Sequence, residues 1–283
     1  MNDFGKGIVC MVFGTFLLTS HDAVSKYMTS TFSVGEVLIY RSLIPALLLA
    51  AVLMRAGGTR ALVPRSPGPN LLRAALAAAT SFLVVAAYAA IPLADALTIV
   101  FASPVFVTAL SAPLLGEKVD WRRWGAVLLG FFGVLLMVEP GSGLIRAGAL
   151  IAVAAALASA FRDIVTRKLG SGDSTTNIML YTTLTTGLVG IGSLAFSTTR
   201  LPTAVEFAVM SGAGLLATAA HWLMIRALQL AEASFVIPLR YLAIVYAAIY
   251  GYLVFDEIPG WAQIAGALIV VGSGVFILRR PQR

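Results

Sequence analysis

Ten long apolar runs dominate this sequence and limit what it can fold into. A helix needs about 20 predominantly apolar residues to cross the hydrocarbon core of a bilayer. Backbone polar groups in lipid must bond within their own segment, so each run predicts one helix. The sequence therefore predicts an all-α membrane protein with ten transmembrane helices, at residues 5–28, 34–54, 70–90, 94–115, 122–139, 146–168, 175–196, 204–230, 234–255 and 261–279.

Composition supports a membrane protein and argues against several other classes. Of the 283 residues, 59% are hydrophobic and only 12% are charged, which is about half the charged share of a soluble domain. The net charge is +7, but Lys and Arg gather in the loops, as they do on one face of a membrane protein, so we expect no nucleic-acid partner. Cys10 is the single cysteine, which excludes an intramolecular disulfide. We expect no cofactor and no metal site.

One charge pattern occurs twice in the chain. HDAVSK at His21–Lys26 returns 141 positions later as RDIVTR at Arg162–Arg167. In both, an Asp follows a His or Arg and precedes a cation by four residues. These matches predict two halves of five helices each, residues 1–141 and residues 142–283. Further matches at a similar spacing are Tyr40 with Tyr181, Glu117 with Glu257, Trp121 with Trp261 and Gly125–Ala126 with Gly266–Ala267.

An odd number of helices in each half places the second half upside down in the membrane. The loop Glu117–Arg123 contains three cations, whereas its equivalent Asp256–Trp261 contains none. Because cytoplasmic loops are enriched in Lys and Arg, we expect equivalent loops on opposite faces, with both termini cytoplasmic. The protein is then multi-pass in the inner (plasma) membrane. Inverted repeats around a site near the midplane are typical of secondary transporters.

Two longer stretches carry a family resemblance. IPLADALTIVFASPVFVTALSAPLLGEKVDWRRWGAVLLGFFGVLLMVEPG at Ile91–Gly141 and PLRYLAIVYAAIYGYLVFDEIPGWAQIAGALIVVGSGVFIL at Pro238–Leu278 resemble the two halves of the EamA-type drug/metabolite transporter superfamily, and HDAVSKY resembles its first helix. The family's closing Gly-Glu is Gly116-Glu117 in the first half but Asp256-Glu257 in the second. The resemblance implies two inverted five-helix repeats. It also implies a carrier that exports amino acids and other metabolites, or takes up cofactor-like compounds.

The repeated motif places an acid and a base one helical turn apart. Asp22 and Lys26 are i,i+4 neighbours, and so are Asp163 and Arg167, with the acid first, which is the favourable order. We expect an ion pair at each position, near opposite faces of the membrane. Two interpretations stay open: a structural pair that fixes the depth of the helix, or a gate pair that holds one end of the path shut. The nearby cation argues against a simple proton-coupling site at either Asp.

Polar and aromatic side chains inside the apolar runs are the candidates for substrate contact, because ionisable residues at membrane depth usually face a cavity. His221 offers a hydrogen-bonding ring, Trp222 a stacking face, and Pro104 a kink that frees a carbonyl. Arg240 can bind a carboxylate or reach the surface. Each also has a packing explanation, which stays open. The predicted substrate-binding residues are Thr19, Ser20, Thr80, Ser81, Phe82, Tyr88, Phe101, Ser103, Pro104, Phe161, His221, Trp222, Arg240 and Tyr241.

Other features of the apolar runs have a structural explanation. Arg41 is expected to pair with Glu36 within the second run. Glycines crowd the fifth and tenth runs, where close helix contact explains them as scaffold or dimer surface, and we expect a monomer or a weak homodimer in the lipid bilayer. These glycines are Gly130, Gly133, Gly266, Gly272 and Gly274.

The sequence favours a carrier over an enzyme or a channel. It contains no HExxH zinc motif and no P-loop, and the two motif aspartates are expected near opposite faces, where they cannot share a catalytic water. A solute channel stays an alternative from a different class. Rings and hydroxyls with few fixed charges suit a small-molecule substrate such as an amino acid. The leading prediction is export of amino acids, including hydrophobic and aromatic ones, and the runner-up is an uptake carrier for a cofactor-like metabolite.

Overall fold

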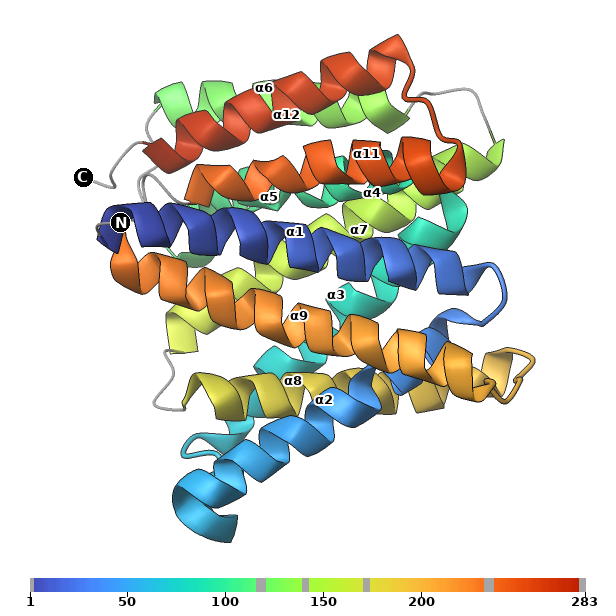
Figure 1. Cartoon of the computed structure of the whole chain (residues 1–283). Coiled ribbons are helices and arrows are strands. Elements are labelled where there is room, and N and C mark those ends of the chain that lie inside the picture. Colours follow the sequence, from blue (N-terminus) through green and yellow to red (C-terminus); the bar gives the residue numbers. More distant parts are fainter. Residues whose placement is uncertain (1–2, 116–120, 139–142, 170–173, 232–236, 280–283) are drawn as a thin grey trace.

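The computed structural model describes residues 3–115, 121–138, 143–169, 174–231 and 237–279, and all regular structure in these residues is helical (Figure 1). Seven helical segments are long and apolar enough to cross a membrane, and three shorter apolar helices accompany them. The elements are α1 (Asp3–Thr29), α2 (Val34–Gly57), η1 (Gly58–Leu62), α3 (Pro67–Ala90), α4 (Leu93–Val100), α5 (Ser103–Leu115), α6 (Trp121–Val138), α7 (Gly143–Leu169), α8 (Thr175–Ser193), η2 (Leu194–Phe196), α9 (Ala204–Leu230), η3 (Ile237–Tyr241), α11 (Leu242–Phe255) and α12 (Trp261–Arg279).

The fourth predicted helix is broken in two. The sequence predicts one helix over residues 94–115, whereas the chain forms α4 and α5 with a break at Phe101 and Ala102. Pro104 lies in the first turn of α5 and has no N–H to give to the carbonyl of Val100. At the break, the Ala102 N–H donates to the carbonyl of Ile99 and the Val105 N–H to that of Ala102, which are three-residue rather than four-residue steps. The kink predicted from Pro104 is therefore confirmed.

The ninth predicted helix also begins irregularly. The sequence predicts one helix over residues 234–255. In the described residues of this range, 237–255, the chain forms the 3-10 helix η3 followed by α11. The three shorter apolar helices are 124–136, 239–255 and 261–276. Each is below the usual length of a crossing, so ten complete crossings stay a prediction, while the all-helical membrane character is confirmed.

The helices pack in pairs that join the first half of the chain to the second. The most extensive contacts are α1 with α9, α2 with α8, α3 with α7 and α6 with α12. In the predicted repeat, α1 corresponds to α7 and α3 to α9, so the first and third of these are one contact made twice. The other two each join a helix to its own equivalent. This is the pattern expected of two related halves around a pseudo-two-fold axis.

Figure 1 shows α6 and α12 side by side at one edge of the bundle and α2 and α8 at the opposite edge, with the remaining long helices between them. The edge helices carry large exposed leucines: Leu47 on α2 is 67% exposed, Leu128 on α6 67%, Leu188 on α8 64% and Leu268 on α12 70%. Exposure of a leucine side chain costs free energy in water but not in hydrocarbon, so these edges suit contact with lipid.

Two helices approach closely at Gly214. A Cβ atom there would collide with the carbonyl oxygen of Arg41 on α2 and with the ring of Pro45. The preceding carbonyl, of Ala213, accepts a hydrogen bond from His21 on α1. Three helices therefore meet where α9 has no side chain.

We predict that Gly214→Ala destabilises the protein, because the new methyl group must push α2 away from α9; overpacking of this kind costs about 1–3 kcal/mol. Thermal unfolding of the purified protein in detergent measures the effect as a lower melting temperature. Gly212→Ala is the matched control, since its Cβ would meet nothing within 4 Å on the same helix. Equal melting temperatures for the two variants would contradict the close approach.

Candidate functional site

A network of charged and backbone groups lies at the last turn of α1. The Lys26 Nζ atom lies 2.9 Å from Glu257 Oε1. It also donates to the carbonyl oxygens of Tyr88, at 3.1 Å, and Ile91, at 2.7 Å. The ring centroid of Phe255 is 5.3 Å from the same nitrogen. An ammonium group has three N–H donors, so the acceptors match its capacity. We call this set the Lys26–Glu257 network.

Glu257 carries the network on to α4. Its second oxygen, Oε2, accepts a hydrogen bond of 2.9 Å from the N–H of Leu93, the first residue of α4. The chain enters this position through Asp256, which has a left-handed φ of 53°. The positive charge of Lys26 thus lies at the C-terminal end of α3, and the negative charge of Glu257 lies at the N-terminal end of α4. Each charge is favourable beside the helix dipole at that end. The network joins α1, α3, α4 and the segment between α11 and α12.

The predicted Asp22–Lys26 pair is wrong, because the fold brings Lys26 a better set of partners than its neighbour one turn away. Asp22 instead interacts electrostatically with Arg41 and Tyr88. In the second copy of the motif, Asp163 Oδ1 pairs with the adjacent Arg162, with the NH2 nitrogen at 2.9 Å. The side chain of Arg167 lies outside the described residues, so its predicted pairing with Asp163 stays a prediction.

A buried junction joins α1, α2 and α9 beside this network. The Nδ1 atom of His21 donates to the carbonyl of Ala213 at 2.9 Å. Its Nε2 lies 2.9 Å from the NH1 nitrogen of Arg41, which reaches Ser25 Oγ at 3.3 Å. Because a guanidinium only donates, the His21 ring accepts at Nε2 and is neutral.

Arg41 therefore does not pair with Glu36, as its position in the second run had suggested. The Glu36 carboxylate accepts hydrogen bonds from the backbone N–H groups of Ser33, at 2.8 Å, and Arg200, at 2.6 Å. Glu36 thus fixes the start of α2 as part of a capping box. The sequence could not show that α1 supplies the partners of Arg41.

Aromatic rings and hydroxyls meet between α1 and α11. Ser20 Oγ lies 2.7 Å from the Tyr250 hydroxyl oxygen. The Phe16 ring packs edge-on against Tyr246, with centroids 5.6 Å apart, and beside Tyr250 at 6.4 Å. The sequence predicted Ser20 as a substrate-binding residue, but it did not predict Phe16, Tyr246 or Tyr250. Tyr246 and Tyr250 are four residues apart and so share a helix face, a signal that was present in the sequence.

The two broken segments meet through a second aromatic pair. Phe101, at the break after α4, lies 5.5 Å from Tyr241 at the end of η3, measured between ring centroids. Tyr241 is buried, while Ser103 and Pro104 at the start of α5 are half-buried. Of the predicted substrate-binding residues, Phe101 and Tyr241 thus come together from the two halves of the chain.

The remaining predicted residues divide into packed and exposed positions. Thr19 and Thr80 are buried and donate to carbonyls of their own helices, at 3.0 and 2.8 Å. His221 is exposed, and its Nδ1 donates to the carbonyl of Ala217 at 2.7 Å. Tyr88 is buried, Ser81 is half-buried and Phe82 packs against the core beside Val85, whereas Phe161 is 42% and Trp222 60% exposed.

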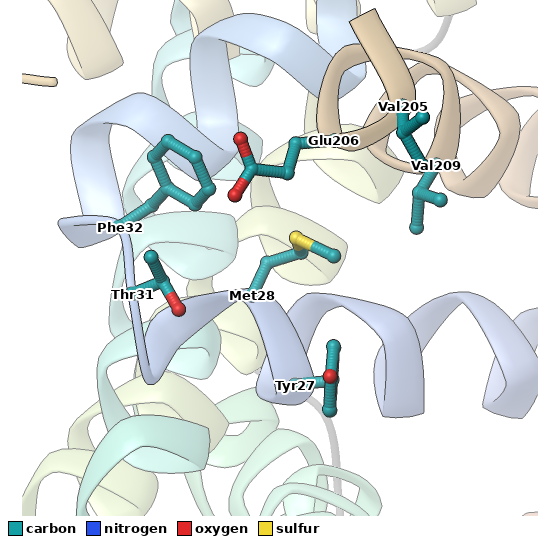
Figure 2. Close-up of a pocket in the computed structure, with 7 residues that line it drawn as sticks. All are labelled: Tyr27, Met28, Thr31, Phe32, Val205, Glu206 and Val209. Atoms are coloured by element: carbon teal, nitrogen blue, oxygen red, sulfur yellow. The ribbon is translucent and has the colours of Figure 1, made fainter. Parts of the chain in front are cut away.

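A pocket on the surface lies apart from these positions, between the ends of α1 and α9 (Figure 2). Its one charged residue, Glu206, accepts hydrogen bonds from Thr203 and from the guanidinium of Arg200, so its charge is already met. No predicted substrate-binding residue lines it. In the described part of the chain, no group of His, Cys, Asp or Glu is arranged to hold a metal ion. The lining residues are Tyr27, Met28, Thr31, Phe32, Val205, Glu206 and Val209.

Comparison with known proteins shows which family and which characterised transporters this chain resembles. The EamA-like transporter family matches it twice, over residues 5–139 and 146–279. The S-adenosylmethionine uptake transporter of Rickettsia prowazekii is 26% identical and aligns over 98% of this chain and 95% of its own. The pseudopaline exporter of Pseudomonas aeruginosa is 28% identical, over 97% and 96%. The riboflavin transporter of Vibrio cholerae is 28% identical, over 96% and 92%. A solved crystal structure with 18% identity superimposes with a TM-score of 0.64 over 95% of both chains, which shows the fold alone.

We predict that the Ser20–Tyr250 hydrogen bond couples α1 to α11. In a double-mutant cycle, Ser20→Ala and Tyr250→Phe should each lower the melting temperature, and the double variant should lose less than the two single losses together. The coupling expected for one hydrogen bond is about 0.5–1.5 kcal/mol. Strictly additive losses would show that the two hydroxyls do not bond.

Proposed function

The chain belongs to the EamA-like transporter family, and we propose that it is a carrier that moves small organic solutes across a membrane by alternating access. Its named relatives are transporters of organic solutes. The observation that carries the proposal is the Lys26–Glu257 network, which ties α1 of the first half to the end of α11 in the second half. A charged contact between halves at one end of a bundle can hold that end shut and separate when the halves rock.

We propose further that residues 1–141 and 142–283 are inverted repeats in the inner membrane with both termini cytoplasmic. The paired helix contacts support this arrangement, as do the two separate family matches and the cations of the loops before α6 and after α2. In this orientation, the Lys26–Glu257 network closes the outer end. We propose no enzymatic step.

Amino acids, including hydrophobic and aromatic ones, are the first substrate class that we propose, and export is the first direction. The ring pairs Phe16–Tyr246 and Phe101–Tyr241 support a solute with an apolar or aromatic part. The second candidate is uptake of a cofactor-like metabolite. It is favoured by the functions of the named relatives, which include uptake of S-adenosylmethionine and transport of riboflavin.

Counterflow in proteoliposomes tests the proposed function. Labelled phenylalanine, methionine, S-adenosylmethionine and riboflavin are offered outside, with the same unlabelled solute inside. A carrier should give saturable, transient accumulation that needs the internal solute. Flux that rises linearly with concentration, or single-channel currents in a planar bilayer, would support the channel alternative and overturn the carrier.

We predict that a crosslink across the Lys26–Glu257 contact stops transport. In a Cys10→Ser background, which removes the native thiol, the variant Lys26→Cys with Glu257→Cys is treated with a short bis-methanethiosulfonate reagent. Counterflow should fall to the level of empty liposomes, because the two crosslinked halves can no longer separate at this end. It should return when the crosslink is reduced.

The two single-cysteine variants, treated in the same way, are the controls for modification without a crosslink. Mass spectrometry reports the extent of crosslinking. A fully crosslinked protein that exchanges solute as fast as its reduced form would show that this end does not open during transport.

A further inference from the structure

The break between α4 and α5 leaves two backbone carbonyl groups without a donor. At the break, the Ala102 N–H donates to the carbonyl of Ile99 and the Val105 N–H to that of Ala102. Both bonds pass by the carbonyl oxygens of Val100 and Phe101, and within the described residues no hydrogen bond reaches either oxygen. An unmet carbonyl is costly at membrane depth, so two adjacent acceptors suit a donor that the chain itself does not supply.

Pro104 prevents the chain from meeting one of these carbonyls in the usual way. In a continuous helix, the N–H of residue 104 would donate to the carbonyl of Val100, and proline has no N–H. A movement of the helices during transport cannot restore this bond. The sequence therefore excludes it in every conformation that the helices adopt.

The unmet carbonyls lie at the end of an interior helix. α4 contacts α1, α3, α6, α7, α11 and α12, so helices of both halves surround it. Val100 and Phe101 are nevertheless only half-buried, as are Ser103 and Pro104 on the other side of the break. Incomplete packing beside an interior helix leaves room for a small molecule to approach the carbonyls.

The break also lies where the two halves are related to each other. The spacing of 140 that matches Trp121 with Trp261 matches Phe101 with Tyr241, and the rings of these last two residues lie 5.5 Å apart. Equivalent positions touch only where the pseudo-two-fold axis of the proposed inverted repeat passes between them. Exchange of the two halves maps this contact onto itself, so it is kept in both states of the carrier. Solute sites of inverted-repeat transporters lie at such a repeat interface, near the midplane.

A positively charged group with N–H donors fits this surrounding. Carbonyl oxygens only accept hydrogen bonds, and those in the last turn of a helix lie at the negative end of its dipole. The faces of the Phe101 and Tyr241 rings also attract cations. An ammonium group supplies three N–H donors together with the charge, whereas a carboxylate or phosphate supplies no donor and has the wrong sign.

We propose that the break between α4 and α5 binds an ammonium group of the transported solute, which donates to the carbonyl oxygens of Val100 and Phe101 beside the Phe101–Tyr241 rings. This inference deepens the proposed function and rests on it for the word transported. It narrows the substrate to solutes with a protonated amine, among which amino acids are the first class. The binding itself can be tested without transport.

Calorimetric titration of the full-length protein in nanodiscs tests the site with phenylalanine, 3-phenylpropionate and N,N,N-trimethylphenylalanine. Because Arg240 directly precedes Tyr241 in the chain, every probe keeps the carboxylate, so that the probes differ only at the amino group. The second probe lacks the ammonium group, and the third keeps the charge without N–H donors. Wild-type protein should bind phenylalanine at least about tenfold more tightly than either, because only phenylalanine forms charge-assisted hydrogen bonds to the carbonyls.

Substitution of Pro104 assigns the binding to the break. Pro104→Ala supplies the N–H that can bond the carbonyl of Val100, so it should weaken phenylalanine binding about tenfold and leave 3-phenylpropionate binding unchanged. Pro45→Ala is the matched control, since Pro45 lies inside α2, away from the break, and this variant should bind as wild type. If Pro104→Ala is not monodisperse, Pro104→Gly replaces it, because glycine supplies the same N–H.

The inference is overturned if wild-type protein binds 3-phenylpropionate or the trimethyl probe as tightly as phenylalanine, or if the folded Pro104 variant binds phenylalanine as wild type does. Counterflow of the same preparations separates this failure from failure of the carrier. Ammonium-dependent binding without counterflow of any solute would leave the site and remove the carrier, and counterflow without a preference for the ammonium group would do the reverse.

Discussion

The structure depends on one constraint: polar groups placed in hydrocarbon must find their partners within the protein. Helices meet this constraint for most of the backbone, and the exceptions are instructive. Pro104 leaves the carbonyl of Val100 without its helical donor, and the chain responds by ending α4 and starting α5. Lys26 meets the exposed carbonyls where α3 ends, and Glu257 meets the N–H where α4 begins. At the junction of α3 and α4, charged side chains therefore complete the irregular backbone.

The same constraint links the close packing of α2 against α9 to the burial of polar side chains beside it. Gly214 lets the backbone of α2 touch α9, and at that point the side chain of Arg41 passes to His21, whose other nitrogen bonds the carbonyl of Ala213. The guanidinium is acceptable there because the neutral imidazole accepts from it. Packing against a bare glycine and hydrogen bonding by a buried cation therefore support each other across three helices.

The sequence predicted the helical class, the approximate positions of the apolar helices and a kink at Pro104, because these follow from local composition and backbone chemistry, but it predicted one helix where the chain forms α4 and α5. It predicted less of the candidate site. The Asp22–Lys26 pair was inferred from i,i+4 spacing, yet Lys26 bonds to Glu257, 231 positions away, which spacing within one helix cannot reveal. Arg41 was likewise assigned to Glu36, five residues earlier in the same apolar run, whereas its side chain bonds to His21 and Ser25 of α1. Tyr246 and Tyr250 show the opposite case, since their shared face was visible in the sequence.

The polar groups at the two ends of the bundle differ in how fully the protein meets them, and this difference bears on the proposed mechanism. Every N–H of the Lys26 ammonium has an acceptor at one end. Toward the other end, Arg73 on α3 and Arg240 on η3 make no hydrogen bond or ion pair with the described residues. In a state of an alternating-access carrier that is open on one side, the closed end must hold without solvent while the open end must still admit a solute. A channel would leave both ends to water.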